Sequence, residues 1–201
     1  MKLKSVFALL SFGAAVTLSA APDLSAYKTP DTAKNLVKNG GFETVITAKK
    51  WIPNWGKLTA NVIQDKEVKH SGEASLKIGG VPKGFATVSF QFGKIAGLQN
   101  DLLIRGWCKY ENIENSKECF IGIWTSLANG RNSRKFALVS IPKGSGNWFY
   151  FEEVLKVDAL KAACANIKPE PPVSCSFRIN IYKDSGWLWL DDVEIIPLEK
   201  K

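Results

Sequence analysis

Histidine and methionine are nearly absent from this chain. Its 201 residues include one His and one Met, whereas tryptophan occurs 7 times and phenylalanine 11 times. A single imidazole excludes a His-rich metal site and any mechanism that uses two histidines. No second base accompanies the sole histidine, His70, which disfavours a catalytic role for it. Hydrophobic residues make up 45% and charged residues 23% of the chain, which is typical of a globular protein and excludes general disorder.

The first 21 residues have the three parts of a secretory signal peptide. Lys2 and Lys4 precede an apolar run over residues 6–16, and small residues follow at 19–21. We therefore expect cleavage after Ala20 or Ala21 and a secreted or periplasmic protein. The run is shorter than the roughly 20 residues that span a bilayer, and no cysteine follows it, so we expect no membrane anchor. A buried N-terminal helix is the alternative.

The rest of the chain is predicted to be all-β. Residues 22–34 hold two prolines and no periodic pattern, which indicates a flexible leader. From residue 35 onward, apolar residues alternate with polar ones in short runs separated by Gly, Pro, Asn and Ser turns. Such runs predict an antiparallel β-sandwich over residues 35–198. The single stretch with helix-forming composition, residues 158–165, is expected to form a short helix within a loop.

The four cysteines form an even set in a chain that we expect to be exported, so disulfides are predicted. Four cysteines allow three pairings. The equal spacing of Cys108 from Cys119, and of Cys164 from Cys175, suggests two local bridges. A zinc site is the alternative, although neither pair has the short gap of a zinc ribbon.

One strand register supports the first of these bridges. If residues 102–124 form a hairpin with Cys108 opposite Cys119, then Gly106 faces Ile121 and Ile104 faces Ile123. This register turns every apolar residue of the two strands inward. The bridge between Cys164 and Cys175 has no comparable support.

Aromatic and polar side chains are predicted to point outward from these strands. Trp107 and Trp124 are candidate stacking platforms, Arg105 and Asn180 are candidate hydrogen-bonding groups, and Tyr182 is predicted on the same outer surface. A sugar ring offers an apolar face that stacks on an aromatic ring, and hydroxyls that need fixed partners. The alternative is a second buried layer, in which loops or the leader cover these rings.

Four segments, taken together, resemble the carbohydrate-binding modules of the family 4, 9 and 22 type. They are the stretches at residues 35–43, 70–78, 105–113 and 189–195, and Pro53-Asn54-Trp55 matches the turn that follows the first of them. They occur in the family's order and span nearly all of the predicted domain. The resemblance implies a galactose-binding-like jelly-roll fold. It is much less specific for the ligand.

The same resemblance implies a structural Ca²⁺ between the first segment and the last strand. It assigns Glu43 and Asp191 as ligands, with carbonyls near Gly41 and Gly72. Strand alternation independently predicts that Asp191 points inward among apolar groups, where a buried carboxylate needs a compensating cation or donor. The alternative is an Asp191 at the edge of the sandwich that accepts hydrogen bonds from backbone amides.

These observations favour an exported, non-catalytic protein that binds a polysaccharide on an aromatic-lined sheet face, either alone or docked on a partner protein or enzyme. An envelope or matrix protein-interaction module is the main alternative. A jelly-roll glycoside hydrolase or polysaccharide lyase is disfavoured, because adjacent carboxylates such as Glu152 and Glu153 point to opposite faces of a strand. The net charge of +8 is diffuse, which disfavours nucleic acid as a partner. Cleavage of the signal peptide removes two lysines, and the remaining charge of +6 is compatible with acidic glycans.

Overall fold

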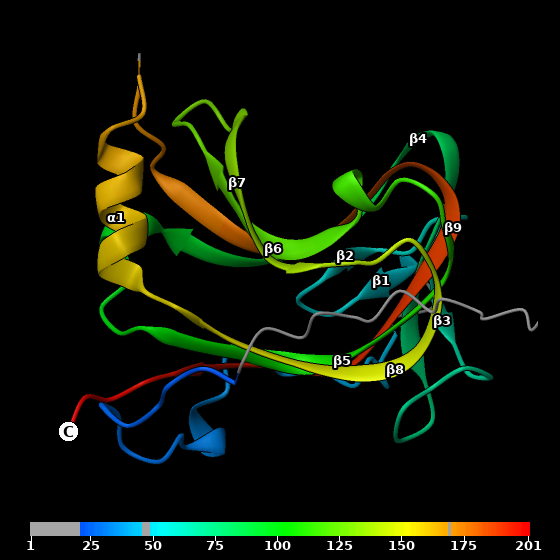
Figure 1. Ribbon diagram of the computed structural model, residues 1–201, viewed down its shortest axis with the longest axis horizontal. Coiled ribbons are helices and arrows are strands. Elements are labelled where there is room, and N and C mark those ends of the chain that lie inside the picture. The colour runs from blue at the N-terminus through cyan, green and yellow to red at the C-terminus, as the bar shows by residue number, and fades with distance from the viewer. Residues whose placement is uncertain (1–20, 46–48, 169) are drawn as a thin grey trace, which may run out of the picture.

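A computed structural model describes residues 21–45, 49–168 and 170–201 of the chain (Figure 1). Apart from Ala21, the predicted signal peptide lies outside these residues. The main elements are β1 (Trp51–Ile52), β2 (Gly56–Lys57), β3 (Val62–Asp65), β4 (Ser75–Lys94), β5 (Leu102–Ile113), β6 (Phe120–Ser126), β7 (Asn132–Ser140), β8 (Gly144–Leu155), α1 (Val157–Ala165) and β9 (Ser174–Pro197). Short 3₁₀ turns lie at η1 (Thr32–Lys34), η3 (Ile95–Gly97) and η4 (Ser116–Glu118).

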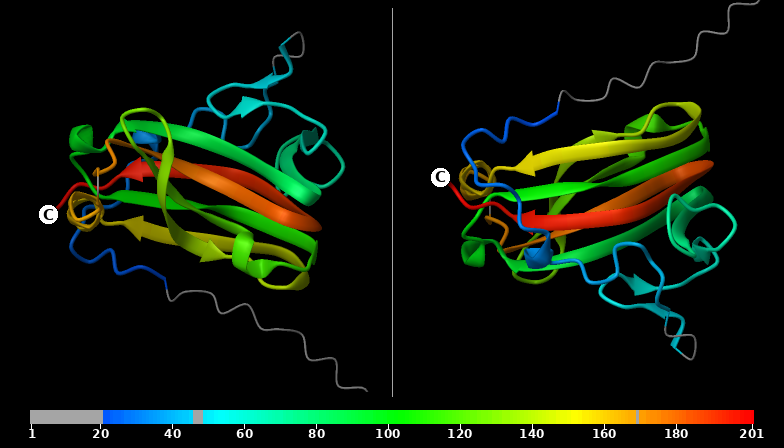
Figure 2. Two further views of the ribbon diagram at one scale, coloured as in Figure 1. Left: turned by 90° about the horizontal axis from the view of Figure 1, so that it is seen from above. Right: turned by 90° about the horizontal axis from the view of Figure 1, so that it is seen from below.

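Two long strands, β4 and β9, run through both layers of a β-sandwich. The first half of β9 pairs with β6 and with the second half of β4, and β7 extends this layer beyond β6. The second half of β9 pairs with β5 and with the first half of β4, while β8 and β3 lie at the edges. All these pairings are antiparallel. We call the layers the β6 sheet and the β5 sheet; they lie above and below one another in Figure 1 and are seen from two sides in Figure 2.

The strands change sheet where their regular pairing breaks. The register between β4 and β9 shifts on both sides of Val81, and Lys183 in β9 has a positive φ of 50°. Gly79 has a φ of 148°, and a Cβ at this position would lie 2.2 Å from the carbonyl oxygen of Gly186. Glycine is therefore required where the two chains cross closely at the bend.

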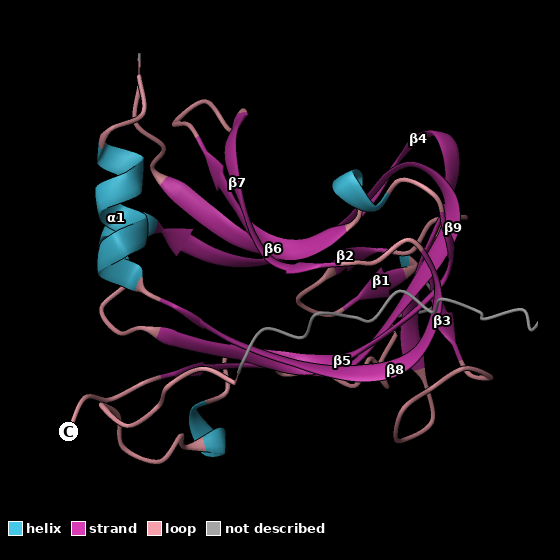
Figure 3. Cartoon of the chain, viewed as in Figure 1, coloured by secondary structure: helices cyan, strands magenta, loops and turns pink. Residues whose placement is uncertain are grey.

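The core fills the space between the two sheets. Ile104 and Leu190 point into it from the β5 sheet, and Ile123 and Phe177 from the β6 sheet, all fully buried. Helix α1 buries Leu160 and Cys164 and lies at one end of the sandwich, where the sheets diverge (Figure 3). The predicted jelly-roll sandwich is thus confirmed, as is a helix that begins one residue before the predicted segment.

The predicted hairpin over residues 102–124 is wrong. Strands β5 and β6 do not pair with each other; each pairs with a different half of β9, so they lie in opposite sheets. The register that placed Cys108 opposite Cys119 therefore does not exist, and Cys108 instead faces Leu190.

Disulfides are also not formed at the predicted positions. Cys108, Cys119, Cys164 and Cys175 are buried free thiols. Burial raises the pKa of all four, to about 12 for Cys119 and Cys175, because an ionised thiolate is poorly solvated in the core. They pack as small apolar side chains.

The predicted flexible leader is instead docked on the outer side of the β5 sheet (Figures 1 and 2). Tyr27 is 3% exposed and packs with Leu103, Ile196 and Leu198. Its backbone forms a β-bridge with Lys200, and its hydroxyl donates a hydrogen bond to Asp101. The prolines that suggested flexibility lie outside this contact.

Candidate functional site

The predicted ligand-binding residues point away from the core, as strand alternation requires, but they divide between two opposite surfaces. Arg105 and Trp107 lie on the outer side of the β5 sheet, which we call the β5 face. Trp124, Asn180 and Tyr182 lie on the outer side of the β6 sheet, which we call the β6 face. The structure therefore brings together three of the five residues and separates the two predicted platforms.

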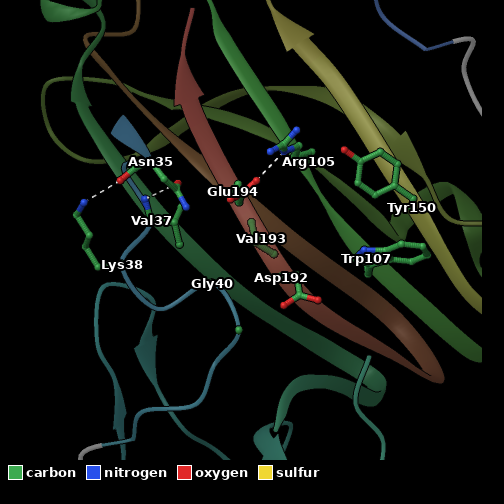
Figure 4. Close-up of a pocket in the computed structure, with 11 residues that line it drawn as sticks. Asn35, Val37, Lys38, Gly40, Arg105, Trp107, Tyr150, Asp192, Val193 and Glu194 are labelled. Carbon is green, nitrogen blue, oxygen red and sulfur yellow. Dashed lines mark hydrogen bonds and ion pairs between the residues drawn. The ribbon is translucent and has the colours of Figure 1, made fainter. Parts of the chain in front are cut away.

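A pocket of about 540 Å³ opens on the β5 face (Figure 4). It lies between residues 35–41 and the strands β5, β8 and β9. Its lining includes Asn35, Lys38, Arg105, Trp107, Tyr150 and Glu194.

The charge of Arg105 is already neutralised within this pocket. Its Nε lies 2.6 Å from a carboxylate oxygen of Glu194, and its Nη1 lies 3.7 Å from Glu152. The hydroxyl of Tyr150 donates to the same Glu152 carboxylate at 2.5 Å. Burial, together with this carboxylate, raises the pKa of Tyr150 to about 12. The network contains one cation and two carboxylates, so no positive charge is left over for a ligand.

Trp107 is covered on one side by the sole histidine. The His70 ring stacks on it with centroids 3.9 Å apart and an angle of 15° between the planes. His70 Nδ1 lies 2.8 Å from Asp192 Oδ2, and the Ser71 hydroxyl donates a hydrogen bond to the other carboxylate oxygen, Asp192 Oδ1. This arrangement fixes the loop before β4 against the sheet, and it gives His70 a structural role.

The two predicted calcium ligands meet beneath that loop. A Cβ on Gly41 would lie 3.5 Å from Glu43 Oε1 and 3.8 Å from Asp191 Oδ1, so both carboxylates converge on this glycine. Asp191 is fully buried, and its Oδ2 accepts hydrogen bonds from the amides of His70 and Ser71 at 2.8 and 3.1 Å. Burial raises its pKa. Backbone amides thus donate to Asp191, as the alternative prediction for this residue expected, and the Glu73 amide donates to Glu43. Carboxylates are also the hard oxygen donors that Ca²⁺ prefers.

The prediction that Asp191 points into the core is wrong. Asp191 faces Trp107 across β5 and β9, on the outer side of the sheet, and the loop at His70 covers it there. Asp192 adopts a positive φ of 50°, and the register slips at this point, so the alternation that continues to Val193 changes phase. Among the described residues, no group of three or more His, Cys, Asp or Glu side chains gathers as a metal cluster.

Side chains on the β6 face stand in regular rows across the strands. Tyr182 on β9 lies opposite Phe85 on β4, and the next row joins Thr87, Asn180 and Phe120. Further along, Arg178 lies between Ser89 and Gly122, and Ser176 lies beside Trp124. One surface thus carries aromatic, hydroxyl, amide and guanidinium groups at strand spacing.

The two ends of this surface differ in exposure. Phe85 and Tyr182 are 66% and 37% exposed, whereas Phe120 is buried and its ring stacks at 6.2 Å on that of Trp124. The Asn180 amide donates to the carbonyl oxygen of Glu118 at 3.2 Å, which holds it in place beside Phe120. Sequence reasoning missed Phe85, although its position next to the inward Ala86 would have placed it on the outer face.

The chain was compared with known proteins. No protein-family model and no curated protein matches its sequence. Solved structures do match. A family 22 xylan-binding domain of Paenibacillus barcinonensis Xyn10C aligns at a TM-score of 0.53 with 15% identity, over 88% of this chain and 99% of that one.

The chain has the fold of a carbohydrate-binding module. A family 16 carbohydrate-binding module has a TM-score of 0.50 with 15% identity, over 80% of this chain and 99% of the other. The C-terminal family 22 module of Clostridium thermocellum Xyn10B has a TM-score of 0.50 with 11% identity, over 90% and 98%. At these identities the likeness is one of fold, and it confirms the expected galactose-binding-like jelly roll. The shared fold does not show which surface of this protein binds a ligand, so that surface has to be inferred from its side chains.

Proposed function

We propose that this protein is an exported, non-catalytic carbohydrate-binding protein that holds a polysaccharide on its β6 face. The observation that carries the proposal is the row formed by Phe85 and Tyr182, two exposed rings side by side at one end of a polar sheet surface. The fold supports it, because solved structures of carbohydrate-binding modules share this architecture.

The β6 face offers both kinds of contact that a sugar chain needs. Phe85 and Tyr182 provide apolar ring surface for the C–H face of a pyranose. Thr87, Ser89 and Asn180 follow at strand spacing. The Thr87 hydroxyl and the Asn180 amide each donate one hydrogen bond to a backbone carbonyl, which fixes their position, and their oxygens still accept hydrogen bonds from sugar hydroxyls. A linear chain laid along β9 contacts stacking groups first and polar groups next.

The β5 face is the weaker candidate for the same role. Arg105 is engaged by Glu152 and Glu194, and His70 covers one side of Trp107. We therefore assign Arg105 and Trp107 to the structure of this face and not to ligand binding. Glu152 and Glu194 share a face, but both bond to Arg105, so we do not propose that they act as a hydrolytic pair.

Two matched tyrosines test the choice of face. Tyr182 and Tyr150 are 37% and 38% exposed on opposite sides of the sandwich. Wild type, Tyr182→Ala and Tyr150→Ala are compared by affinity electrophoresis in gels with xylan, β-glucan, galactan, mannan, glucuronoxylan, alginate or polygalacturonate. We expect retardation in at least one gel, lost in Tyr182→Ala and kept in Tyr150→Ala. The reverse pattern, or no retardation in any gel, contradicts the proposal.

We further propose that Glu43 and Asp191 hold a structural Ca²⁺ near Gly41. The support is the convergence of the two carboxylates on that glycine and the burial of Asp191. The bound ion neutralises two acids that no lysine or arginine side chain bridges within the described residues. Its role is to fix the loop at His70 onto the β5 sheet, away from the glycan surface.

Export remains part of the proposal, on the strength of the N-terminal sequence. The described residues include no helix that is both long and apolar enough to span a membrane. Mass spectrometry of the protein recovered outside the cytoplasm tests it: a mature chain that begins at residue 21 or 22 is expected, and an intact Met1 contradicts it.

A further inference from the structure

Arg178 is a half-buried cation without an acidic partner. It lies in the middle of the β6 face, and its Nε donates to the Ser176 hydroxyl at 3.1 Å. Within the part of the chain that the structure describes, no carboxylate lies within ion-pair distance of it. Burial lowers the pKa of its guanidinium, and no nearby acid offsets that effect. A desolvated charge in this position normally has a counterion.

Arg105 on the β5 face also points outward with a strand on either side, but its neighbours differ from those of Arg178. Arg105 lies between Glu152 and Glu194, directly across the neighbouring strands. Arg178 lies between Ser89 and Gly122 in the same sense. The two positions that hold acids beside Arg105 on the β5 face are occupied by Ser89 and Gly122 beside Arg178, so neither neighbouring strand supplies a carboxylate. The backbone of β7 fills the space at Gly122, which leaves the Ser89 side as the approach to the guanidinium.

Cations accompany all three rings that β6 and β9 place on the β6 face. The Lys135 ammonium lies 4.8 Å from the Phe120 centroid, the Arg178 guanidinium carbon 5.3 Å from that of Trp124, and the Lys183 ammonium 5.1 Å from that of Tyr182. Glu118 is the acid that reaches this set, and it bonds to Lys135 at 3.3 Å. With three cations and one acid, this group of side chains carries a net positive charge.

Trp124 adds an unused donor beside that charge. Its Nε1 is covered by neighbouring atoms and has no acceptor among the described residues. A buried N–H without a partner is unfavourable, and an oxygen acceptor that reaches it would remove that cost. The indole N–H and the neighbouring guanidinium are both hydrogen-bond donors that need an oxygen acceptor. The guanidinium is charged and therefore prefers an anionic oxygen.

We propose that the β6 face binds an acidic polysaccharide, and that Arg178, with Trp124 beside it, binds the carboxylate of a uronic acid residue. This inference rests on the proposed function, because Phe85 and Tyr182 hold the same chain by stacking. Arg178 lies two rows along β9 from Tyr182. Its planar fork matches a carboxylate with two parallel hydrogen bonds.

The test compares acidic polysaccharides with their carboxyl-reduced forms, which keep the backbone and lose the charge. Glucuronoxylan, alginate and polygalacturonate, each native and reduced, are titrated at physiological salt against wild type, Arg178→Gln and Arg178→Lys. Arg134→Gln is the matched control: it removes the same charge from an exposed position on β7, next to Lys135. Dextran sulfate is included to separate carboxylate recognition from attraction to any polyanion. Melting temperatures verify that each variant is folded.

We expect wild type to bind at least one native polymer about tenfold more tightly than its reduced form. Arg178→Gln reduces this ratio to near one without weakening binding of the reduced polymer, Arg178→Lys gives an intermediate ratio, and Arg134→Gln preserves it. The inference is overturned if wild type binds native and reduced polymers equally well. It is also overturned if Arg178→Gln keeps the preference of wild type for the native polymer. Binding of dextran sulfate that matches the best native polymer overturns it as well. If the charge preference is absent but Tyr182→Ala abolishes binding, the proposed function holds and the role of Arg178 does not. If no polymer binds to wild type, both the proposed function and the role of Arg178 are contradicted.

Discussion

Arg178 lies over the indole of Trp124, with its guanidinium carbon 5.3 Å from the ring centroid. On the other side of the sandwich, Arg105 lies beside Trp107 but is bonded to Glu152 and Glu194. Two outward arginines thus have the same kind of aromatic neighbour and opposite electrostatic surroundings. Arg105 is neutralised within the molecule, whereas Arg178 has no acidic partner among the described residues.

The Arg105 network predicts a loss of stability without a loss of binding. Arg105→Gln leaves two partly buried carboxylates next to each other and removes the 2.6 Å bond to Glu194. We expect the free energy of unfolding to fall by about 1–3 kcal/mol. Urea denaturation measures this change. A variant of unchanged stability that no longer binds glycan would place the ligand on the β5 face.

Calcium is predicted to stabilise the fold through Glu43 and Asp191. Addition of millimolar Ca²⁺ to chelator-treated protein raises the melting temperature, because the ion binds the folded state and not the unfolded chain. Asp191→Asn abolishes this rise. Glu73→Gln is the control, since Glu73 contacts Glu43 through its backbone amide alone. An Asp191→Asn variant that still responds to Ca²⁺ shows that the ion binds elsewhere.

The contact between Tyr27 and Asp101 predicts a pH-dependent contribution to stability. Burial opposes ionisation of Asp101, but hydrogen bonds from Tyr27 and the Val157 amide and the charge of Lys156 outweigh it and lower its pKa. The folded-state pKa therefore lies below that of the unfolded chain, about 3.9. The stabilisation is complete well above that value and is lost as the pH falls through the folded-state pKa.

We therefore expect Asp101→Asn to lower the free energy of unfolding by about 1–2 kcal/mol at pH 7. The difference from wild type narrows below about pH 4. Tyr27→Phe, which removes one donor and keeps the ring, has a smaller effect at pH 7. Urea denaturation at pH 7 and pH 3 measures the free energies of unfolding. A gap between wild type and Asp101→Asn that is larger at pH 3 than at pH 7 would contradict the lowered pKa of Asp101.

Gly122 is predicted to be intolerant of a side chain. A Cβ there would lie 2.4 Å from the Phe136 carbonyl oxygen and 3.0 Å from the Ala137 Cα, so the backbone of β7 would have to move. We expect Gly122→Ala to destabilise the fold by about 1–3 kcal/mol. Gly97→Ala is the control, because nothing lies within 4 Å of its added Cβ. Equal melting temperatures for the two variants would mean that β7 yields freely.

The alternation of apolar residues predicted the fold class and placed Arg105, Trp124 and Asn180 on the outer side of their strands, because burial of one strand face leaves a period of two. It could not choose strand partners. Any two alternating strands can be aligned so that apolar residues meet, so the agreement over residues 102–124 supported a hairpin that does not form. The true partner of both strands is β9, whose 24 residues run through both sheets.

The candidate site was predictable only in part, for a related reason. Asn180 and Tyr182 share a face because no bulge separates them, and Trp124 joins them through the pairing of β6 with β9. Trp107 was grouped with them because the two sheets could not be told apart. Asp191 was assigned the wrong side because the positive φ of Asp192 changes the phase of alternation, and a short-range pattern of residue types does not reveal it.

The position of the ligand on the molecule is tested most directly by NMR titration of ¹⁵N-labelled protein with the glycan that binds most tightly. The indole N–H signals of Trp124 and Trp107 report on the two faces in one spectrum. We predict that the Trp124 signal shifts together with the amides of Thr87, Asn180 and Tyr182, and that the Trp107 signal does not move. Shifts confined to Trp107 and Tyr150 would contradict this account.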